Sequence, residues 1–223
     1  MTKKQRILKI IGQFDKTYPD ADCSLDYVNP LQLMVATQLA AQCTDARVNI
    51  VTKNLFEKYK TVQDFADAEQ EELEQDIKST GFYRNKARNI ISACRMLSAD
   101  FGGTVPARME DLLKLPGVGR KTANLLLYDC FGLPGIVVDT HAKRLSKRMG
   151  LTVNDDPEKI EYDLMKLVPV EKWGSLCHQL VFHGRAVCNA RKPLCEKCGI
   201  RPFCKYGLYS GIDPDMHQNS QTQ

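Results

Sequence analysis

Four cysteines lie in one short segment of this 223-residue chain, at Cys188, Cys195, Cys198 and Cys204, with the spacing C-x6-C-x2-C-x5-C. Thiolates this close in sequence can surround one metal centre once the loops between them fold back. Tetrahedral zinc accepts four cysteines, usually as two separated CxxC pairs, whereas a four-iron cluster tolerates uneven spacing. The spacing therefore predicts a metal site and leaves zinc and iron–sulfur open.

Basic residues accompany these cysteines. Arg191 and Lys192 lie in the first loop of the segment, between Cys188 and Cys195. A loop fixed at both ends by metal ligands would hold its cations in one place, which suits a phosphate group. The alternative is that these side chains only solvate the metal-binding loop.

A second motif is the run LPGVGRKTA, from Leu115 to Ala123, which joins two apolar helical patterns. Gly117 and Gly119 permit backbone angles closed to other residues, so the turn can be very tight. The amides of the turn and of the next helix start would then face outward and bind an anion such as DNA phosphate. An ordinary turn between helices would explain the glycines but not the cations Arg120 and Lys121 beside them.

Those two cations would occupy the first turn of a helix, where the helix dipole disfavours positive charge. The same field favours the neutral form of the Lys121 amine, and a neutral amine is a competent nucleophile. The alternative is a solvated lysine that pairs with phosphate. Asp139 follows at the end of the apolar run Gly135–Val138 and precedes the basic stretch HAKRLSKRMG. Asp is a preferred N-cap, and a capping carboxylate is held rigidly enough to serve in catalysis as well.

Helices must position all of these residues, because helical periodicity runs through nearly the whole chain and strand-like alternation is scarce. We expect an all-α protein. Its helices include an amphipathic one at the start and others beginning at Pro30, Asn85, Asp139 and Pro157, a Lys53–Tyr59 stretch, an acidic one over Ala68–Lys78, and a pair around the hairpin turn. The run from Pro30 is expected to stay helical through Gln42. The tail 211–223 is polar and expected to be disordered.

Composition limits the class of protein. The net charge of +4 permits a polyanionic partner without requiring one, and no apolar run is long enough to cross a bilayer. The chain start has no signal-peptide core. The five remaining cysteines are scattered singly, mostly in apolar helical stretches, so a secreted disulfide scaffold is disfavoured. Trp173 and His178 are expected to be packing residues.

LPGVGRKTAN, then VVDTH, then the four cysteines closely resemble the endonuclease III family of DNA glycosylases. The resemblance runs from about Pro30 through Cys204 and includes LAAQCTDARVN and STGFYRNKARNI. It implies a bifunctional base-excision repair enzyme. Lys121 would attack the sugar C1′ of an oxidised pyrimidine nucleotide, Asp139 would assist, and the resulting Schiff base would allow β-elimination 3′ to the abasic site.

The resemblance also assigns two residues to the gap that a flipped-out base leaves. Gln42 matches the residue that enters the vacated space, and Phe82 matches an apolar wedge at the opposite strand, where leucine is more usual in the family. From the residues alone, Gln42 would be the polar face of a helix and Phe82 a hydrophobic contact closing the loop after Gly81.

The family pattern favours a [4Fe-4S] cluster on the four cysteines. The implied fold has two helical lobes with a cleft between them: an iron–sulfur cluster lobe from residues 1–22 and 134–210, and a six-helix barrel over 23–133 that contains the helix–hairpin–helix at about 109–130. Lys121 and Asp139 would face each other across the cleft. The expected partner is double-stranded DNA with damaged bases or abasic sites, bound by a cytoplasmic, nucleoid-associated bacterial monomer.

Other functions stay open at this point. A glycosylase without lyase activity would share the fold, but Lys121 argues against it. A non-enzymatic DNA-binding module could use the hairpin and basic helices alone, and a zinc scaffold would be colourless. The range of damaged bases and the role of His141 are not set by these motifs.

Overall fold

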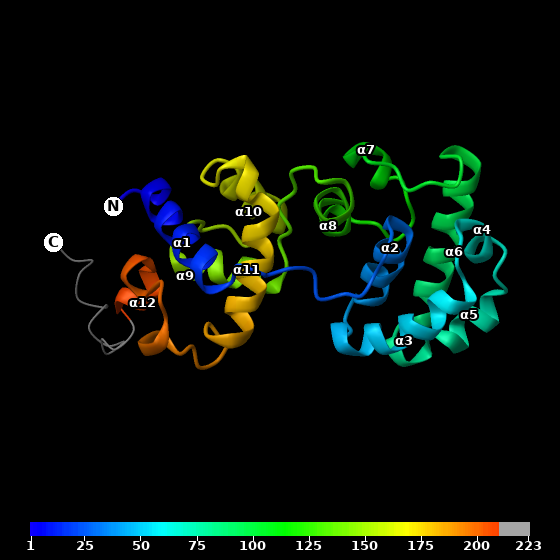
Figure 1. Cartoon of the computed structure of the whole chain (residues 1–223), viewed down its shortest axis with the longest axis horizontal. Coiled ribbons are helices and arrows are strands. Elements are labelled where there is room, and N and C mark those ends of the chain that lie inside the picture. Colours follow the sequence, from blue (N-terminus) through cyan, green and yellow to red (C-terminus); the bar gives the residue numbers. More distant parts are fainter. Residues whose placement is uncertain (210–223) are drawn as a thin grey trace. The chain divides into compact units, whose positions relative to one another are not determined.

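The computed structural model describes residues 1–209 and is helical throughout, with no β-strand in that range. The expected all-α class is therefore confirmed. The elements are α1 (Lys3–Thr17), α2 (Pro30–Leu39), α3 (Asp45–Lys58), α4 (Val62–Ala66), α5 (Gln70–Asp76), η1 (Lys78–Thr80), α6 (Tyr83–Asp100), α7 (Met109–Leu112), α8 (Arg120–Phe131), α9 (Thr140–Met149), α10 (Pro157–Met165), η2 (Val170–Lys172), α11 (Trp173–Ala186), η3 (Cys195–Lys197), η4 (Arg201–Phe203) and α12 (Lys205–Tyr209). Figure 1 shows them along the chain.

The chain forms two units. One, called the inserted unit here, runs from Cys23 to Val137, and the other, the terminal unit, joins Met1–Asp22 to the chain from Val138 onward. Residues 134–137, which the sequence placed with the cluster lobe, belong to the inserted unit. The predicted tail 211–223 lies outside the described residues.

The core of the inserted unit is built around α2 and α6. Asn29 caps α2 by accepting a hydrogen bond from the Gln32 amide, and Pro30 takes the first helical position, where its missing N–H is no loss. Helix α2 is buried on almost every side, because it contacts α3, α6 and α8. Helix α6 in turn contacts α4 and α5, so the two helices together bring distant loops to one region.

The terminal unit pairs the first helix with the last ones. Helix α1 buries Ile7, Ile10, Ile11 and Phe14, the apolar face that the sequence predicted, and it contacts α11 and η4. Helix α9 contacts α10, α11 and α12. His178 is buried and Trp173 half-buried, with the indole N–H donating to the Val168 carbonyl at 3.0 Å.

Several helix limits differ from the sequence-based expectation. Helix α2 ends at Leu39 rather than continuing to Gln42, and α3 already begins at Asp45. Helix α6 begins at Tyr83, just after Phe82. Within residues 1–209, no helix is both long and apolar enough to cross a bilayer.

Candidate functional site

The predicted hairpin joins α7 to α8 through the turn around Gly117. Gly117 has φ +77°, which favours glycine, and a Cβ there would also come within 2.6 Å of the Gln38 side-chain oxygen. The same expectation is wrong for Gly119, which has φ −96° and ψ 177°, an extended backbone that any residue adopts. A Cβ on Gly119 would meet nothing within 4 Å. The backbone at Gly119 therefore does not require glycine, and the absence of a side chain there leaves the start of α8 accessible.

Helix α8 opens with two cations and has no acidic residue in its first turn. Gly119 occupies the N-cap position and provides no side-chain cap. Lys121 is exposed, and Arg120 is half-buried. The start of α8 thus combines outward amides with two positive side chains, an arrangement that attracts an anion.

Gln42 and Phe82, which the sequence places in separate segments, line one pocket in the inserted unit. The pocket has a volume of about 290 Å³ and is also lined by Gly117 of the hairpin. Both residues have positive φ, 55° for Gln42 and 49° for Phe82, although neither is glycine. Such angles are strained in bulky residues and tend to occur at functional sites.

The structure does not support a helix-face position for Gln42 or a loop-closing hydrophobic contact for Phe82. Gln42 lies in the turn after α2 and not on a helix face. Phe82 is 62% exposed, so it does not close its loop by hydrophobic burial. Each side chain is instead presented at the surface by a constrained backbone.

Lys86, which the sequence analysis did not single out, lies beside this pocket and is only 6% exposed. Its ammonium donates to the Leu39 carbonyl at 2.7 Å and to the Thr80 carbonyl at 2.8 Å. Burial lowers the pKa of Lys86. Gln38, also buried, donates to the Pro116 carbonyl at 3.4 Å and so links α2 to the hairpin.

Asp139 belongs to the terminal unit and caps α9. Its Oδ1 accepts a hydrogen bond from the Ala142 amide at 2.7 Å, as the capping interpretation predicted. The residue is half-buried, and the cap uses only Oδ1 of its two carboxylate oxygens. Lys121 belongs to the inserted unit, and its pairing with Asp139 therefore stays a prediction from the resemblance.

The cations of α9 have structural partners inside the terminal unit. Lys143 and Lys147 pair with Asp155 at 3.5 Å and 2.6 Å. Arg148 donates to the Asn189 and Ala190 carbonyls, each at 2.7 Å. The basic helix thus supports the cysteine segment, a role that its charge alone did not indicate.

His141 is held by an arginine on the same helix. Arg144 Nη2 lies 3.1 Å from His141 Nδ1 and also donates to the Gly184 and Cys188 carbonyls, at 3.2 Å and 3.1 Å. A Cβ on Gly184 would collide with this imidazole, which explains the glycine.

The structure brings all four predicted metal ligands to one cavity. Cys188, Cys195, Cys198 and Cys204 line it together with apolar side chains such as Leu145. In residues 1–209, no three of these sulfurs lie within 4.8 Å of one another. Tetrahedral zinc with Zn–S bonds of ~2.3 Å would place its sulfurs only ~3.8 Å apart. Among the described residues the four sulfurs are therefore not arranged as in a tetrahedral zinc site.

Hydrogen-bond donors surround these sulfurs. The Gly207 amide donates to Cys204 Sγ at 3.4 Å, and Arg148 Nη1 donates to Cys188 Sγ at 3.3 Å. Burial raises the pKa of Cys198 to about 11. A bound metal deprotonates a coordinating thiol and so would act against this effect of burial. Donors to sulfur and a shielded cavity are the means by which proteins tune iron–sulfur clusters.

His183 links the cavity to α1. Its Nε2 lies 3.5 Å from Cys198 Sγ and its Nδ1 lies 3.0 Å from the Tyr18 hydroxyl. Burial lowers the pKa of His183 to about 4, so the ring is neutral at physiological pH. The sequence did not indicate roles for Arg144 and Arg148 of α9 or for His183, because only the fold shows which groups they contact.

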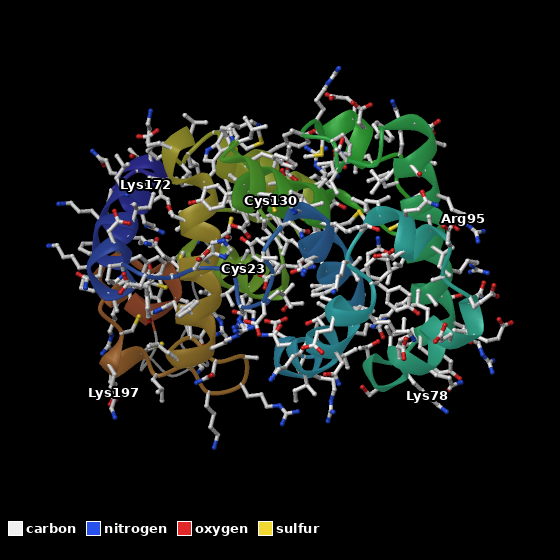
Figure 2. All side chains as sticks on the ribbon, turned by 45° about the vertical axis from the view of Figure 1, so that its right-hand side comes forward. Cys23, Lys78, Arg95, Cys130, Lys172 and Lys197 are labelled. Atoms are coloured by element: carbon white, nitrogen blue, oxygen red, sulfur yellow. The ribbon has the colours of Figure 1, made fainter. Side chains whose placement is uncertain are left out.

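The predicted basic loop follows Cys188. The Leu194 amide donates to the Val187 carbonyl at 2.9 Å and closes the loop, while Arg148 holds two of its carbonyls. Arg191 and Lys192 are exposed on it, as is Lys197 further along the segment (Figure 2). The loop therefore presents cations on a backbone that α9 fixes.

Comparison with known proteins gives consistent matches. The model of the HhH-GPD superfamily, base excision DNA repair proteins, matches residues 35–170. Endonuclease III of Synechocystis sp. (strain PCC 6803) is 54% identical over 204 residues, 91% of this chain and 93% of the relative. Endonuclease III of Bacillus subtilis (strain 168) is 49% identical over 208 residues, 93% of this chain and 95% of the relative.

Solved structures agree. A trapped endonuclease III–DNA covalent intermediate is similar at a TM-score of 0.90 and 47% identity, covering 95% of this chain and 100% of the other. A non-covalent endonuclease III–DNA complex is similar at the same TM-score and identity, covering 96% and 100%. A thermostable thymine-DNA glycosylase, 24% identical with a TM-score of 0.83, shares the fold.

Proposed function

We propose roles for individual residues on the premise that this chain belongs to the endonuclease III family, within the HhH-GPD superfamily of base excision DNA repair proteins. It is a bifunctional DNA glycosylase and abasic-site lyase that acts through a Schiff base. Its substrate is double-stranded DNA with an oxidised pyrimidine or an abasic site. It works as a monomer.

Lys121 is the nucleophile. Its neutral amine attacks C1′, the electron pair of the glycosidic bond leaves with the base, and loss of a proton gives an N-glycoside. The nitrogen lone pair then forms the C1′=N bond as the C1′–O4′ bond breaks, and O4′ takes a proton, which opens the sugar ring and gives the Schiff base. Removal of a proton from C2′ then expels the 3′ phosphate oxygen, which breaks the strand by β-elimination. The exposed position of Lys121 in the first turn of α8, with no acidic residue in that turn, supports this role.

Asp139 assists this chemistry through the part of its carboxylate that the cap leaves open. It accepts a proton from the attacking amine and stabilises positive charge that develops on the sugar. Its hydrogen bond to the Ala142 amide holds the group in one orientation, so little reorganisation is needed during the reaction.

The pocket residues Gln42 and Phe82 fill the DNA after the damaged base leaves the stack. Gln42 takes the vacated position, and Phe82 wedges into the opposite strand, which kinks the duplex. The outward amides at Gly117 and Gly119, with Arg120, bind the phosphates beside the lesion. Arg191 and Lys192 bind the backbone further along.

Cys188, Cys195, Cys198 and Cys204 hold a [4Fe-4S] cluster. The gathering of the four cysteines in one cavity without a tetrahedral zinc arrangement among the described residues, together with the donors to two of the sulfurs, supports this assignment over zinc. When bound, the cluster supplies structural support for the basic loop and no step of the base excision. Purified protein should be brown and contain iron and acid-labile sulfide in equal amounts. A colourless protein that contains zinc would contradict the assignment.

The observation that carries the proposal is Lys121 in the first turn of α8 beside the hairpin. Borohydride added during turnover on a duplex with a single thymine glycol should reduce the Schiff base and trap a covalent protein–DNA complex. Lys121→Gln should form no such complex and should not cut the strand, while Lys166→Gln, an exposed lysine of the terminal unit, should behave as wild type. Absence of the complex with the wild-type protein would contradict the lyase step.

A further inference from the structure

Lys86 is a buried cation in the inserted unit that no step of the proposed chemistry uses. It is only 6% exposed, and within residues 1–209 no carboxylate lies within salt-bridge distance of its ammonium. A buried ammonium is unfavourable unless hydrogen bonds compensate for the lost water. Both of its hydrogen bonds go to backbone carbonyls, so their location indicates what the charge does.

The two carbonyls belong to helix ends. Leu39 is the last residue of α2 and Thr80 the last of η1, and the bonds are 2.7 Å and 2.8 Å long. Terminal carbonyls lack partners inside their own helix and carry the negative end of its dipole. One ammonium therefore hydrogen-bonds to the terminal carbonyls of two helices, at Leu39 and Thr80, which are 41 residues apart in sequence.

Each of these helix ends leads directly into a loop that presents a DNA-inserting residue. Gln42 comes three residues after Leu39, and Phe82 comes two residues after Thr80. Both residues have strained positive φ, and both line the same pocket as Lys86. Strained backbone persists only when its surroundings fix it, and Lys86 is the group that contacts both loops at their origin.

We propose that Lys86 is a positioning residue, which joins the Gln42 loop to the Phe82 loop so that the two side chains enter DNA together as one rigid unit. The inference rests on the insertion roles proposed above for Gln42 and Phe82. It adds that the two insertions are not independent events, because displacement of one loop pulls on the carbonyl that anchors the other.

Lys86→Met tests this proposal, since methionine has a similar length and volume but no donor. Arg95→Met is the matched control. Arg95 is also a cation of α6 (Figure 2) and donates to the Ala66 carbonyl at the end of α4, at 2.9 Å, away from the pocket. Both variants are compared with wild type for single-turnover excision of thymine glycol and for base flipping, followed by 2-aminopurine fluorescence beside the lesion.

The substrate pair separates positioning from folding. On a fully paired duplex, Lys86→Met should flip and excise ~10 to 100 times more slowly, the range expected for displacement of a positioning group by about 1 Å. On a duplex whose base pairs beside the lesion are mismatched, the lesion is already unstacked and excision should return to near the wild-type rate. Arg95→Met should match wild type on both duplexes.

Other outcomes overturn the proposal. A wild-type rate for Lys86→Met on the paired duplex would remove the role, and equal slowing on both duplexes would show a structural effect only. If Lys86→Met does not fold, the ratio of excision rates on the paired and mismatched duplexes is measured for Lys86→Gln, whose shorter side chain reaches one carbonyl at most. Failure of both variants to fold would show that the role of Lys86 is purely structural. Gln42→Ala and Phe82→Ala are measured alongside. Full activity of these two would refute the insertion roles themselves, whereas their impairment beside an unaffected Lys86→Met would refute only the positioning role.

Discussion

Two substitutions of Asp139 separate its role as the N-cap of α9 from its proposed catalytic role, because Asn can still cap the helix and Ala cannot. Asn is as good an N-cap as Asp, since its side-chain oxygen also accepts from the Ala142 amide, a bond of 2.7 Å in the wild type. Asp139→Asn should therefore keep the stability of α9, whereas Asp139→Ala loses the cap. Neither variant has a carboxylate to accept a proton.

The expected magnitudes follow from these contacts. Loss of a side-chain N-cap costs about 1 kcal/mol, which corresponds to a fall in melting temperature of about 2–4 °C for a protein of this size. Loss of a general acid–base group slows a reaction ~100- to 10,000-fold. Asp139→Asn should thus be slow and stable, and Asp139→Ala slow and less stable.

Melting temperature and single-turnover excision of thymine glycol measure both effects. Asp156→Ala is the control, because Asp156 caps α10 in the same way, accepting from the Lys159 amide at 2.9 Å. That variant should lose similar stability with no change in rate. If Asp139→Asn excised the base at the wild-type rate, the capping role would be the only role, and the catalytic assignment would be refuted.

Three further predictions follow from described contacts. Gly117→Ala should destabilise the protein by about 1 kcal/mol or more in denaturant unfolding, because φ is positive. Gly119→Ala should cost less stability, because its backbone is extended and Ala is only a poorer N-cap than Gly, and it should bind abasic-site DNA more weakly in a fluorescence titration. Arg148→Met removes the donors to two loop carbonyls and one cysteine sulfur, so a chelator should bleach the visible absorption faster than in Lys147→Met. Hydrogen bonds from Thr152 and Asn154 hold the pKa of Asp163 below its ordinary value of 3.8. The ionised carboxylate therefore stabilises the folded protein above that pH, and this stabilisation is lost as the pH falls and the group takes up a proton. The difference in melting temperature between wild type and Asp163→Asn should shrink between about pH 5 and pH 3.

Local patterns in the sequence predicted the elements whose signals are themselves local. The amphipathic face of α1, the Asp139 cap and the proline that opens α2 are each set by residues within one or two turns. The gathering of the four cysteines follows from their short spacing. These features needed no knowledge of distant contacts.

Features that depend on distant contacts could not be predicted in this way. The helical pattern of LAAQ suggested a helix through Gln42, but α2 ends at Leu39, whose carbonyl bonds to Lys86. The charge pattern of α9 gave no sign of what its cations contact, and Arg148 bonds to carbonyls 41 and 42 residues away. In both cases the partner is a backbone oxygen, which no residue type reveals.

The division of the chain has a consequence for its order of synthesis. When the ribosome has finished the inserted unit, Cys23–Val137, helix α1 has already been made, but its partners in the terminal unit, α9 to α12, have not. Contacts of α1 with its own unit span most of the chain: Arg6 donates to the Met149 carbonyl, 143 residues on, and Lys172 to Asp15, 157 residues back. Such long-range closure is slow, so we expect the inserted unit to fold before α1 packs against its partners. The four cysteines of the proposed cluster are made last, so the proposed cluster can assemble only after both α1 and the inserted unit have been synthesised.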